Sequence, residues 1–217
     1  MAKIKSVYVC QNCGAESPKW IGKCAACGEW NTYTEEIIRE EKTSKIATIL
    51  GETAKQKPQL ITEIEAQSEK RIDTRSPELN RVLGGGLVKG SLVLIGGEPG
   101  IGKSTLVLQV ALNMEGRRIL YVSGEESTSQ LKIRAERIGT MRSKCYIVSE
   151  TSLEQIFVHI KNIQPELVII DSIQTISTEI AESSPGSITQ VRECSATLLR
   201  FAKESGTPVI LIGHINK

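Results

Sequence analysis

The stretch Gly97-Glu98-Pro99-Gly100-Ile101-Gly102-Lys103-Ser104 decides the fold. It fits the phosphate-loop pattern of a glycine, four residues and Gly-Lys-Ser, and it lies between the apolar run 91–96 and the helical pattern 103–113. The pattern therefore predicts a strand, a glycine-rich loop and a helix, in that order. Glycines let backbone N–H groups turn toward phosphates, and the helix N-terminus adds positive potential. A chance glycine-rich turn is the alternative, and the flanking strand and helix disfavour it.

We expect this loop to bind Mg-ATP. Lys103 would reach the β- and γ-phosphates, and the hydroxyl of Ser104 would ligate Mg²⁺. The expected nucleotide-binding residues of the loop are Gly97, Glu98, Pro99, Gly100, Ile101, Gly102, Lys103, Ser104 and Thr105.

Outward from the loop, short apolar runs alternate with helical patterns. The runs lack polar alternation, as is typical of parallel strands that are buried on both faces. The expected strands are 91–96, 118–123, 145–149, 167–171 and 208–213, and the expected helices are 103–113, 128–138, 153–163 and 188–205. A short helix is expected to begin at Ser76-Pro77-Glu78 and to end at the glycines 84–86. The fold class is α/β with a mostly parallel sheet.

Four acidic or basic side chains follow predicted strands, at the edge where open α/β sheets bind ligands. Asp171 ends the strand 167–171 and is expected to hold Mg²⁺ through water; an Asp that caps a turn is the alternative. Glu125 is the first candidate for the base that activates water and Glu126 the second, although acidic residues also favour helix N-termini. His214 either senses the γ-phosphate or has only a structural role.

Four of the six cysteines form two Cys-x-x-Cys-Gly units, Cys10/Cys13 and Cys24/Cys27. Two intervening residues let both sulfurs of a turn face one ion, and the following glycine can adopt positive φ, so the spacing predicts one tetrahedral Zn²⁺. A redox dithiol is a weaker interpretation, because that motif uses one pair within a large domain. Residues 1–33 are too few for a sufficient core, so the metal must supply most of the folding free energy.

The sequence thus divides into a zinc finger at 1–33, a charged linker at 34–70 and a phosphate-loop core at 71–217. The linker lacks aromatic residues, and short elements are expected at 46–50 and 60–64. With 27 Lys and Arg against 25 Asp and Glu, the net charge of +2 excludes inferring nucleic-acid or membrane affinity from overall charge. Without an apolar span or signal sequence, the chain is expected to be cytoplasmic.

Further motifs follow the cysteine units in a specific order. They are Arg81-Val-Leu-Gly-Gly-Gly-Leu-Val-Lys-Gly-Ser91, Tyr121-Val-Ser-Gly-Glu-Glu126, Asp171-Ser-Ile-Gln174, Pro185-Gly-Ser-Ile-Thr-Gln-Val-Arg-Glu193 and Gly213-His-Ile-Asn-Lys217. Together with the phosphate loop they resemble the RadA (Sms) family of bacterial DNA repair proteins over nearly the whole chain. This resemblance implies a RecA-like ATPase core, DNA-stimulated ATP hydrolysis, hexameric rings and branch migration of recombination intermediates.

The resemblance also implies single-stranded and branched DNA as partners, with a recombinase or helicase as further candidates. The family continues beyond Lys217 with a basic motif and a ring-forming domain, so the present chain is expected to be monomeric and to hydrolyse ATP slowly, with little DNA stimulation. Its final strand, 208–213, is expected to leave an unpaired edge. Residues 178–187 are a candidate DNA-facing loop, but Glu179 and Glu182 make phosphate binding there doubtful.

Two other function classes compete with a DNA-repair ATPase. One is a nucleotide-dependent assembly module whose finger binds a protein or DNA and whose core hydrolyses little. The other is a phosphotransferase for a small molecule, which is disfavoured because no basic lid follows the phosphate loop.

Overall fold

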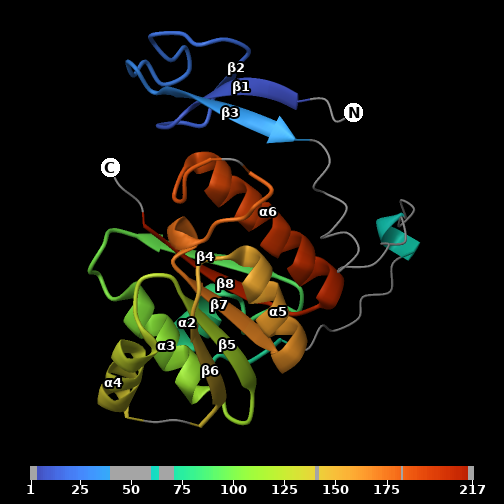
Figure 1. Ribbon diagram of the computed structural model, residues 1–217. Helices are drawn as coiled ribbons and strands as arrows, with labels where there is room; N and C mark the ends of the chain where they lie inside the picture. Colours follow the sequence, from blue (N-terminus) through green and yellow to red (C-terminus); the bar gives the residue numbers. More distant parts are fainter. Residues whose placement is uncertain (1–3, 40–59, 64–70, 140–141, 182, 215–217) are drawn as a thin grey trace.

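The computed structural model describes residues 4–39, 60–63, 71–139, 142–181 and 183–214. They form two parts, a small antiparallel sheet and a larger α/β core (Figure 1). None of the helices described in these ranges is long and apolar enough to cross a membrane.

The core is built on a five-stranded parallel sheet. Its strands run in the spatial order β4-β8-β7-β5-β6. Their bounds are β4 Leu92–Gly97, β5 Arg118–Ser123, β6 Lys144–Ser149, β7 Leu167–Asp171 and β8 Val209–His214. The predicted α/β class and all five predicted strands are confirmed, with ends that shift by at most a residue.

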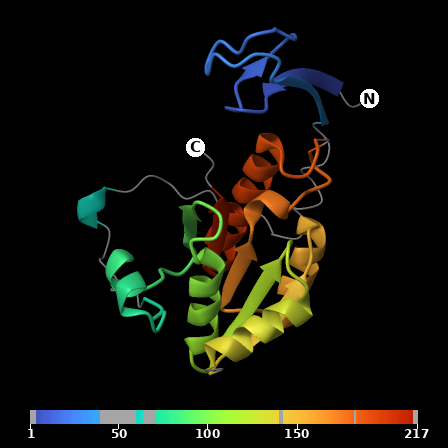
Figure 2. The ribbon, with the colours of Figure 1, turned by 90° about the vertical axis from the view of Figure 1, so that its left-hand side faces the viewer.

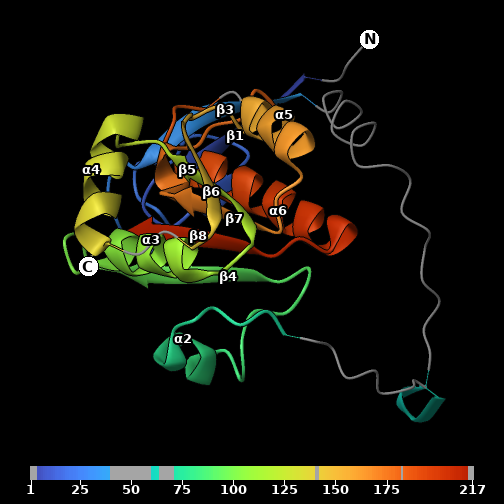
Figure 3. The same cartoon turned by 90° about the horizontal axis from the view of Figure 1, so that it is seen from below.

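Helices cover both faces of this sheet (Figure 3). The chain first moves from β4 to β5 and β6 and then returns through β7 to β8. Because crossovers between parallel strands are right-handed, reversing direction places later helices on the opposite face. Accordingly α3 and α4 share one buried cluster with the sheet, and α5 and α6 share the other. Their bounds are α3 Lys103–Asn113, α4 Thr128–Ile138, α5 Leu153–Ile163 and α6 Ile188–Ser205, as predicted.

Helix ends carry clear sequence signals. Ser127, Ser152 and Ser187 each cap a helix N-terminus by accepting a hydrogen bond from the backbone three residues later. The short helix α2, Pro77–Val82, begins after Ser76 with Pro at its first position, which confirms that prediction.

The two outer strands differ from the expectation that every strand is buried on both faces. Strands β5, β7 and β8 are almost wholly buried, whereas the side chains of Leu94 on β4 and Tyr146 on β6 are 61% and 45% exposed. The expectation of an unpaired edge at 208–213 is also wrong. Strand β8 lies between β4 and β7 and is paired on both sides, so one open edge belongs to β4.

The N-terminal part is an antiparallel sheet of β1 Ile4–Cys10, β2 Glu16–Ser17 and β3 Tyr33–Arg39, in the order β2-β1-β3. Strand β3 pairs with β1 along its whole length, so this sheet runs past residue 33 into the segment expected as linker. The 3-10 helix η2, Ile61–Glu63, falls within the element expected at 60–64. The element expected at 46–50 lies outside the described residues.

The N-terminal sheet contacts the core at the start of α6 (Figure 2). The Arg192 guanidinium lies 3.0 Å from a carboxylate oxygen of Glu16, and a methyl group of Ile188 packs against Gly14. Both ion-pair partners are about half exposed, with exposed fractions of 57% and 47%. Exposed pairs of this kind contribute at most about 1 kcal/mol, so this contact holds the two parts together only weakly.

Candidate nucleotide and metal sites

The carboxyl ends of four strands bring most of the predicted site residues to one edge of the sheet. Register pairs Gly97 of β4 with His214 of β8, and Asp171 of β7 with Ser123 of β5. Because β8 lies between β4 and β7, the phosphate loop, His214, Asp171 and the turn after Ser123 follow one another along this edge. The candidate site is therefore built on rigid strand ends.

The backbone of the phosphate loop turns at two glycines. Gly100 and Gly102 adopt positive φ, at 81° and 93°, where glycine has no steric penalty. Gly102 caps α3 without a side-chain hydrogen bond, and the first turn of α3 carries no acidic residue. The positive helix N-terminus is thus suited to an anion, which fits the phosphates of ATP. Ser104 of this turn is half-buried, and Thr105 is exposed.

Lys103 lies beneath the loop. Its ammonium group donates hydrogen bonds to the carbonyl oxygens of Gly97 and Glu98, both at 2.8 Å, and its side chain is buried. The ammonium group is therefore enclosed by the loop and is not free at the surface. A buried cation needs partners, and the loop carbonyls supply them. Lys103 consequently holds the loop in shape through these two hydrogen bonds.

The two candidate bases lie in different surroundings. Glu125 accepts a hydrogen bond from the Ser172 hydroxyl at 2.9 Å, and the same carboxylate oxygen lies 3.5 Å from His214 Nε2. Glu126 instead forms an ion pair with Arg134 of α4 at 2.7 Å. The geometry thus brings Glu125, and not Glu126, together with His214 and the residue after Asp171.

Gly124 fixes the direction of the turn that carries Glu125. Its N–H donates to the carbonyl oxygen of Asp171 at 3.0 Å. A Cβ atom at position 124 would lie 2.0 Å from Oγ1 of Thr175, which itself donates to the carbonyl oxygen of Ser172. Only glycine allows the turn to pack this closely on the segment after β7. The peptide bond between Asp171 and Ser172 is cis.

Three residues of this site were missed by the sequence reasoning. They are Ser172, which binds Glu125; Tyr121, whose hydroxyl donates to Asp171 Oδ2 at 2.6 Å; and Gln174, whose amide donates to the carbonyl oxygen of His214 at 3.1 Å. Ser172 and Gln174 directly follow the predicted carboxylate, which was the available signal. Tyr121 lies within an apolar run, and nothing in that run marks it.

Residues 178–187, the segment expected to face DNA, are held by hydrogen bonds to side chains of α5 and α6. The buried Gln190 side chain accepts from the Thr178 N–H and donates to the carbonyl oxygens of Ala181 and Ser183. Glu154 of α5 accepts from the Thr178 hydroxyl and the Glu179 N–H. Residue 182 lies outside the described residues. An acidic side chain thus anchors this segment, which adds to the argument against phosphate binding there.

The four cysteines predicted as metal ligands come together in the N-terminal part. The thiol sulfurs of Cys10, Cys13, Cys24 and Cys27 all lie within 4.8 Å of one another. Zn–S bonds of about 2.3 Å in a tetrahedron require sulfurs about 3.8 Å apart. The Cys10–Cys27 and Cys13–Cys24 pairs lie 3.7 and 3.6 Å apart, so the site fits Zn²⁺.

Local geometry supports this metal site. Gly14 and Gly28 have φ values of 75° and 78°, in the positive region that the motif allows, and each N–H donates to the carbonyl oxygen of the first cysteine of its pair. The Tyr33 hydroxyl, 3.5 Å from Cys24 Sγ, and nearby backbone amides lower the pKa of Cys24 to about 6.

Metal analysis is expected to find one zinc ion per chain, and Cys13→Ser is expected to lose it. The apparent binding free energy of a structural Zn²⁺ is about 10–16 kcal/mol, and three described residues (Cys10, Cys24 and Tyr33) form the buried cluster of this part. Cys145→Ser serves as the control, because Cys145 lies on β6, outside the four-cysteine cluster. A folded, reduced wild-type chain without metal would contradict the prediction.

The fold and the phosphate loop define a P-loop protein with an AAA-type or RecA-like core and an N-terminal zinc ribbon. The chain belongs to the family described as AAA domain, whose model matches residues 57–217. Residues 8–35 match the model of the rubredoxin metal binding domain. The predicted architecture, a four-cysteine finger ahead of a parallel-sheet nucleotide-binding core, is confirmed.

Among curated proteins, the chain is similar to DNA repair protein RadA. It is 50% identical to RadA of Bacillus subtilis (strain 168) over 220 residues, which cover 100% of this chain and 48% of that protein. RadA of Pseudomonas aeruginosa is 48% identical over 220 residues, with the same coverage. The resemblance seen in the sequence motifs is confirmed, and the chain spans about half the length of these relatives.

A solved structure supports the fold. The chain matches "The Structure Of A DnaB-Like Replicative Helicase And Its Interactions With Primase" with a TM-score of 0.56 and 19% identity. The match covers 70% of this chain and 45% of that one. At this identity, the likeness concerns the fold alone.

Proposed function

We propose that this chain binds and hydrolyses Mg-ATP and forms the motor portion of a DNA-repair ATPase that acts on single-stranded and branched DNA during branch migration. The observation that carries the proposal is the row of groups along one sheet edge. There the phosphate loop, His214, Asp171 and Glu125 lie on adjacent strand ends. The DNA-repair part of the proposal also draws on the similarity to RadA.

Nucleotide binding follows from the loop. Backbone amides at Gly100 to Gly102 and the N-terminus of α3 bind phosphate oxygens, and Lys103 exchanges a loop carbonyl for phosphate. Ser104 and Asp171 would hold Mg²⁺, the latter through water. When bound, Mg²⁺ neutralises charge that develops on the phosphate oxygens.

Hydrolysis needs a group that accepts the proton of the attacking water, and Glu125 takes this role. The Ser172 hydroxyl fixes its carboxylate, while half of the side chain surface stays open to solvent, with an exposed fraction of 54%. Glu126 is paired with Arg134 and is therefore a poorer base. We propose that His214, 3.5 Å from Glu125 and at the end of the strand next to the phosphate loop, senses whether the γ-phosphate is present.

The zinc ribbon is proposed to recruit a partner, either DNA or a recombinase or helicase. Its weak contact with α6, through Arg192 and Glu16, leaves most of its surface available for this purpose. For a protein with the length of the RadA relatives, the proposal includes a homohexamer in which a neighbouring subunit completes each ATP site with a basic residue. Such residues contribute roughly 10³- to 10⁵-fold to rate in related enzymes.

Steady-state ATP hydrolysis with and without single-stranded and branched DNA tests this proposal. For the 217-residue chain we expect a monomer in size-exclusion chromatography and slow, Mg²⁺-dependent hydrolysis with little DNA stimulation. A stable hexamer with strong DNA stimulation would show that the group acting between subunits lies within these residues. Binding without any turnover would instead favour a nucleotide-dependent assembly module. For a protein with the length of the RadA relatives we expect DNA to stimulate ATP hydrolysis, and the absence of stimulation would contradict the DNA-dependent part of the proposal.

A further inference from the structure

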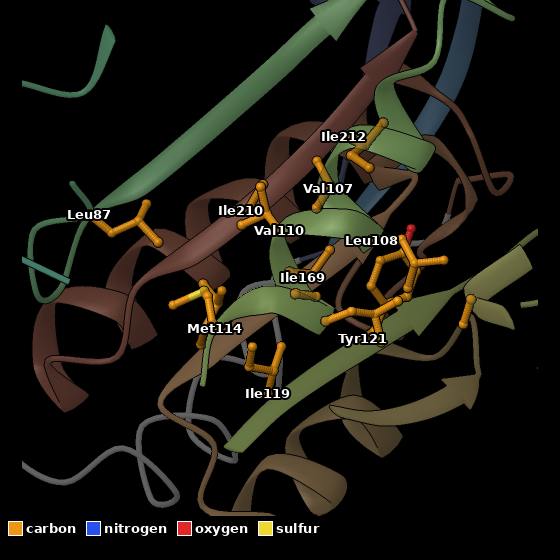
Figure 4. Close-up of a cluster of buried hydrophobic side chains, with 14 of the residues drawn as sticks. Leu87, Val107, Leu108, Val110, Met114, Ile119, Tyr121, Ile169, Ile210 and Ile212 are labelled. Atoms are coloured by element: carbon orange, nitrogen blue, oxygen red, sulfur yellow. The ribbon is translucent and has the colours of Figure 1, made fainter. Parts of the chain in front are cut away.

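The side chain of Tyr121 is a polar group in an apolar core. It is 0% exposed and belongs to the cluster that packs between the sheet and α3. Figure 4 shows its ring among buried aliphatic side chains, with Leu108 of α3 and Ile169 of β7 nearby. A phenylalanine would fill the same space without burying a hydroxyl, and burying an unpaired hydroxyl is costly. The hydroxyl group therefore needs a partner.

That partner is the carboxylate of Asp171, which is itself 6% exposed. The Tyr121 hydroxyl donates to Asp171 Oδ2 at 2.6 Å. Register explains the contact: Tyr121 pairs with Ile169, so Asp171 stands two residues further along the neighbouring strand. Side chains two residues apart on a strand share a face, which places both groups on the α3 side, the side of the phosphate-loop helix.

We propose that Tyr121 is a positioning residue of the nucleotide site: its hydroxyl holds one oxygen of the Asp171 carboxylate, which orients the other oxygen toward the Mg²⁺-bound water. This inference rests on the proposed function. Two neighbouring strands thus contribute to the proposed Mg²⁺ site. Strand β7 supplies the Asp171 carboxylate, and β5 supplies the Tyr121 hydroxyl that fixes the rotation of this carboxylate.

Two physical points support this role. A carboxylate oxygen that accepts a short hydrogen bond from a buried phenol cannot rotate freely, so the second oxygen is held in one direction. The Tyr121 hydroxyl is buried, and the register of β5 on β7 fixes its place beside Asp171, so the two groups stay in contact. Groups that orient metal ligands in this way typically contribute about 10- to 100-fold to metal affinity.

The Mg²⁺ dependence of nucleotide binding tests the proposal. The variant Tyr121→Phe keeps the ring and removes only the hydroxyl. Tyr146→Phe is the matched control, because Tyr146 lies on the adjacent strand β6 and is 45% exposed. Binding of a fluorescent ATP analogue is titrated with Mg²⁺ and repeated in EDTA, and thermal unfolding in EDTA checks the fold of each variant.

For Tyr121→Phe we expect the Mg²⁺ concentration at half-saturation to rise about tenfold or more, with nucleotide affinity in EDTA unchanged. Tyr146→Phe is expected to behave like the wild type in both measurements. An unchanged or lower Mg²⁺ requirement in Tyr121→Phe would overturn the positioning role. Equal losses with and without Mg²⁺ would also overturn it, because they indicate a merely structural residue. A wild-type chain that binds no nucleotide in Mg²⁺ would contradict the proposed function itself.

Discussion

Lys103→Ala is expected to weaken binding of Mg-ATP by roughly 10²- to 10⁴-fold. The ammonium group of Lys103 is proposed to contact two phosphate groups, and hydrogen bonds to charged partners are worth about 1.5–3 kcal/mol each. The same change removes the hydrogen bonds from Lys103 to the carbonyl oxygens of Gly97 and Glu98. The loop without nucleotide therefore also loses two contacts that hold its conformation. Isothermal titration calorimetry with ATP in excess Mg²⁺ measures the effect.

Lys132→Ala is the matched control for this experiment. Lys132 lies on α4, and its side chain is 58% exposed and paired with Glu136. Removing it changes net charge by the same amount as Lys103→Ala but leaves the phosphate loop untouched, so ATP affinity should stay within about twofold of the wild type. If Lys103→Ala and Lys132→Ala bind Mg-ATP equally well, the phosphate loop is not the nucleotide site.

Glu125→Gln is expected to preserve binding of Mg-ATP and to slow its hydrolysis by about 10²- to 10⁴-fold, the usual contribution of a positioned general base. Glutamine keeps the shape of the side chain and still accepts the hydrogen bond from Ser172, so the turn should remain in place. Single-turnover hydrolysis separates this loss of rate from any change in affinity.

Glu126→Gln is the comparison that assigns the base. Glu126 precedes α4 and is held by Arg134 of that helix, and the two side chains are 25% and 32% exposed, so glutamine, which can still accept from Arg134, should keep this turn in place. We expect its turnover to remain within about tenfold of the wild type. An inactive Glu126→Gln together with an active Glu125→Gln would reverse the assignment.

The arrangement of the core was predictable because its local signals agree with one another. The Ser76-Pro77 start, the glycine-rich loop and uninterrupted apolar runs indicate where helices and strands begin, and the structure places those elements as predicted. The cysteine motif is equally local, since each Cys-x-x-Cys turn closes on itself through Gly14 or Gly28.

Strand order and side-chain partners were harder to predict from the sequence, because they depend on contacts between distant parts of the chain. The last strand was expected at an edge, but β8 inserts between β4 and β7, and apolar runs alone do not specify that order. The contact between Tyr121 and Asp171 joins residues 50 positions apart and requires the register of β5 on β7.

The burial of Lys103 is a further feature that the sequence alone did not predict. The motif predicts a lysine that contacts phosphate, but the folding of the loop back over its side chain depends on the positive-φ conformation of Gly100 and Gly102. Likewise, the sequence ranks Glu125 and Glu126 almost equally. Only the positions of Ser172 and Arg134 separate the two carboxylates.

Parallel measurement of Mg-ATP binding and single-turnover hydrolysis for the wild type, Lys103→Ala and Glu125→Gln tests the central claim most directly. We predict that the wild type binds one nucleotide per chain and hydrolyses it, that Lys103→Ala does neither at micromolar ATP, and that Glu125→Gln binds ATP but leaves it intact. Hydrolysis by all three at the same rate would contradict the claim that the phosphate loop and Glu125 form one ATP-hydrolysing site.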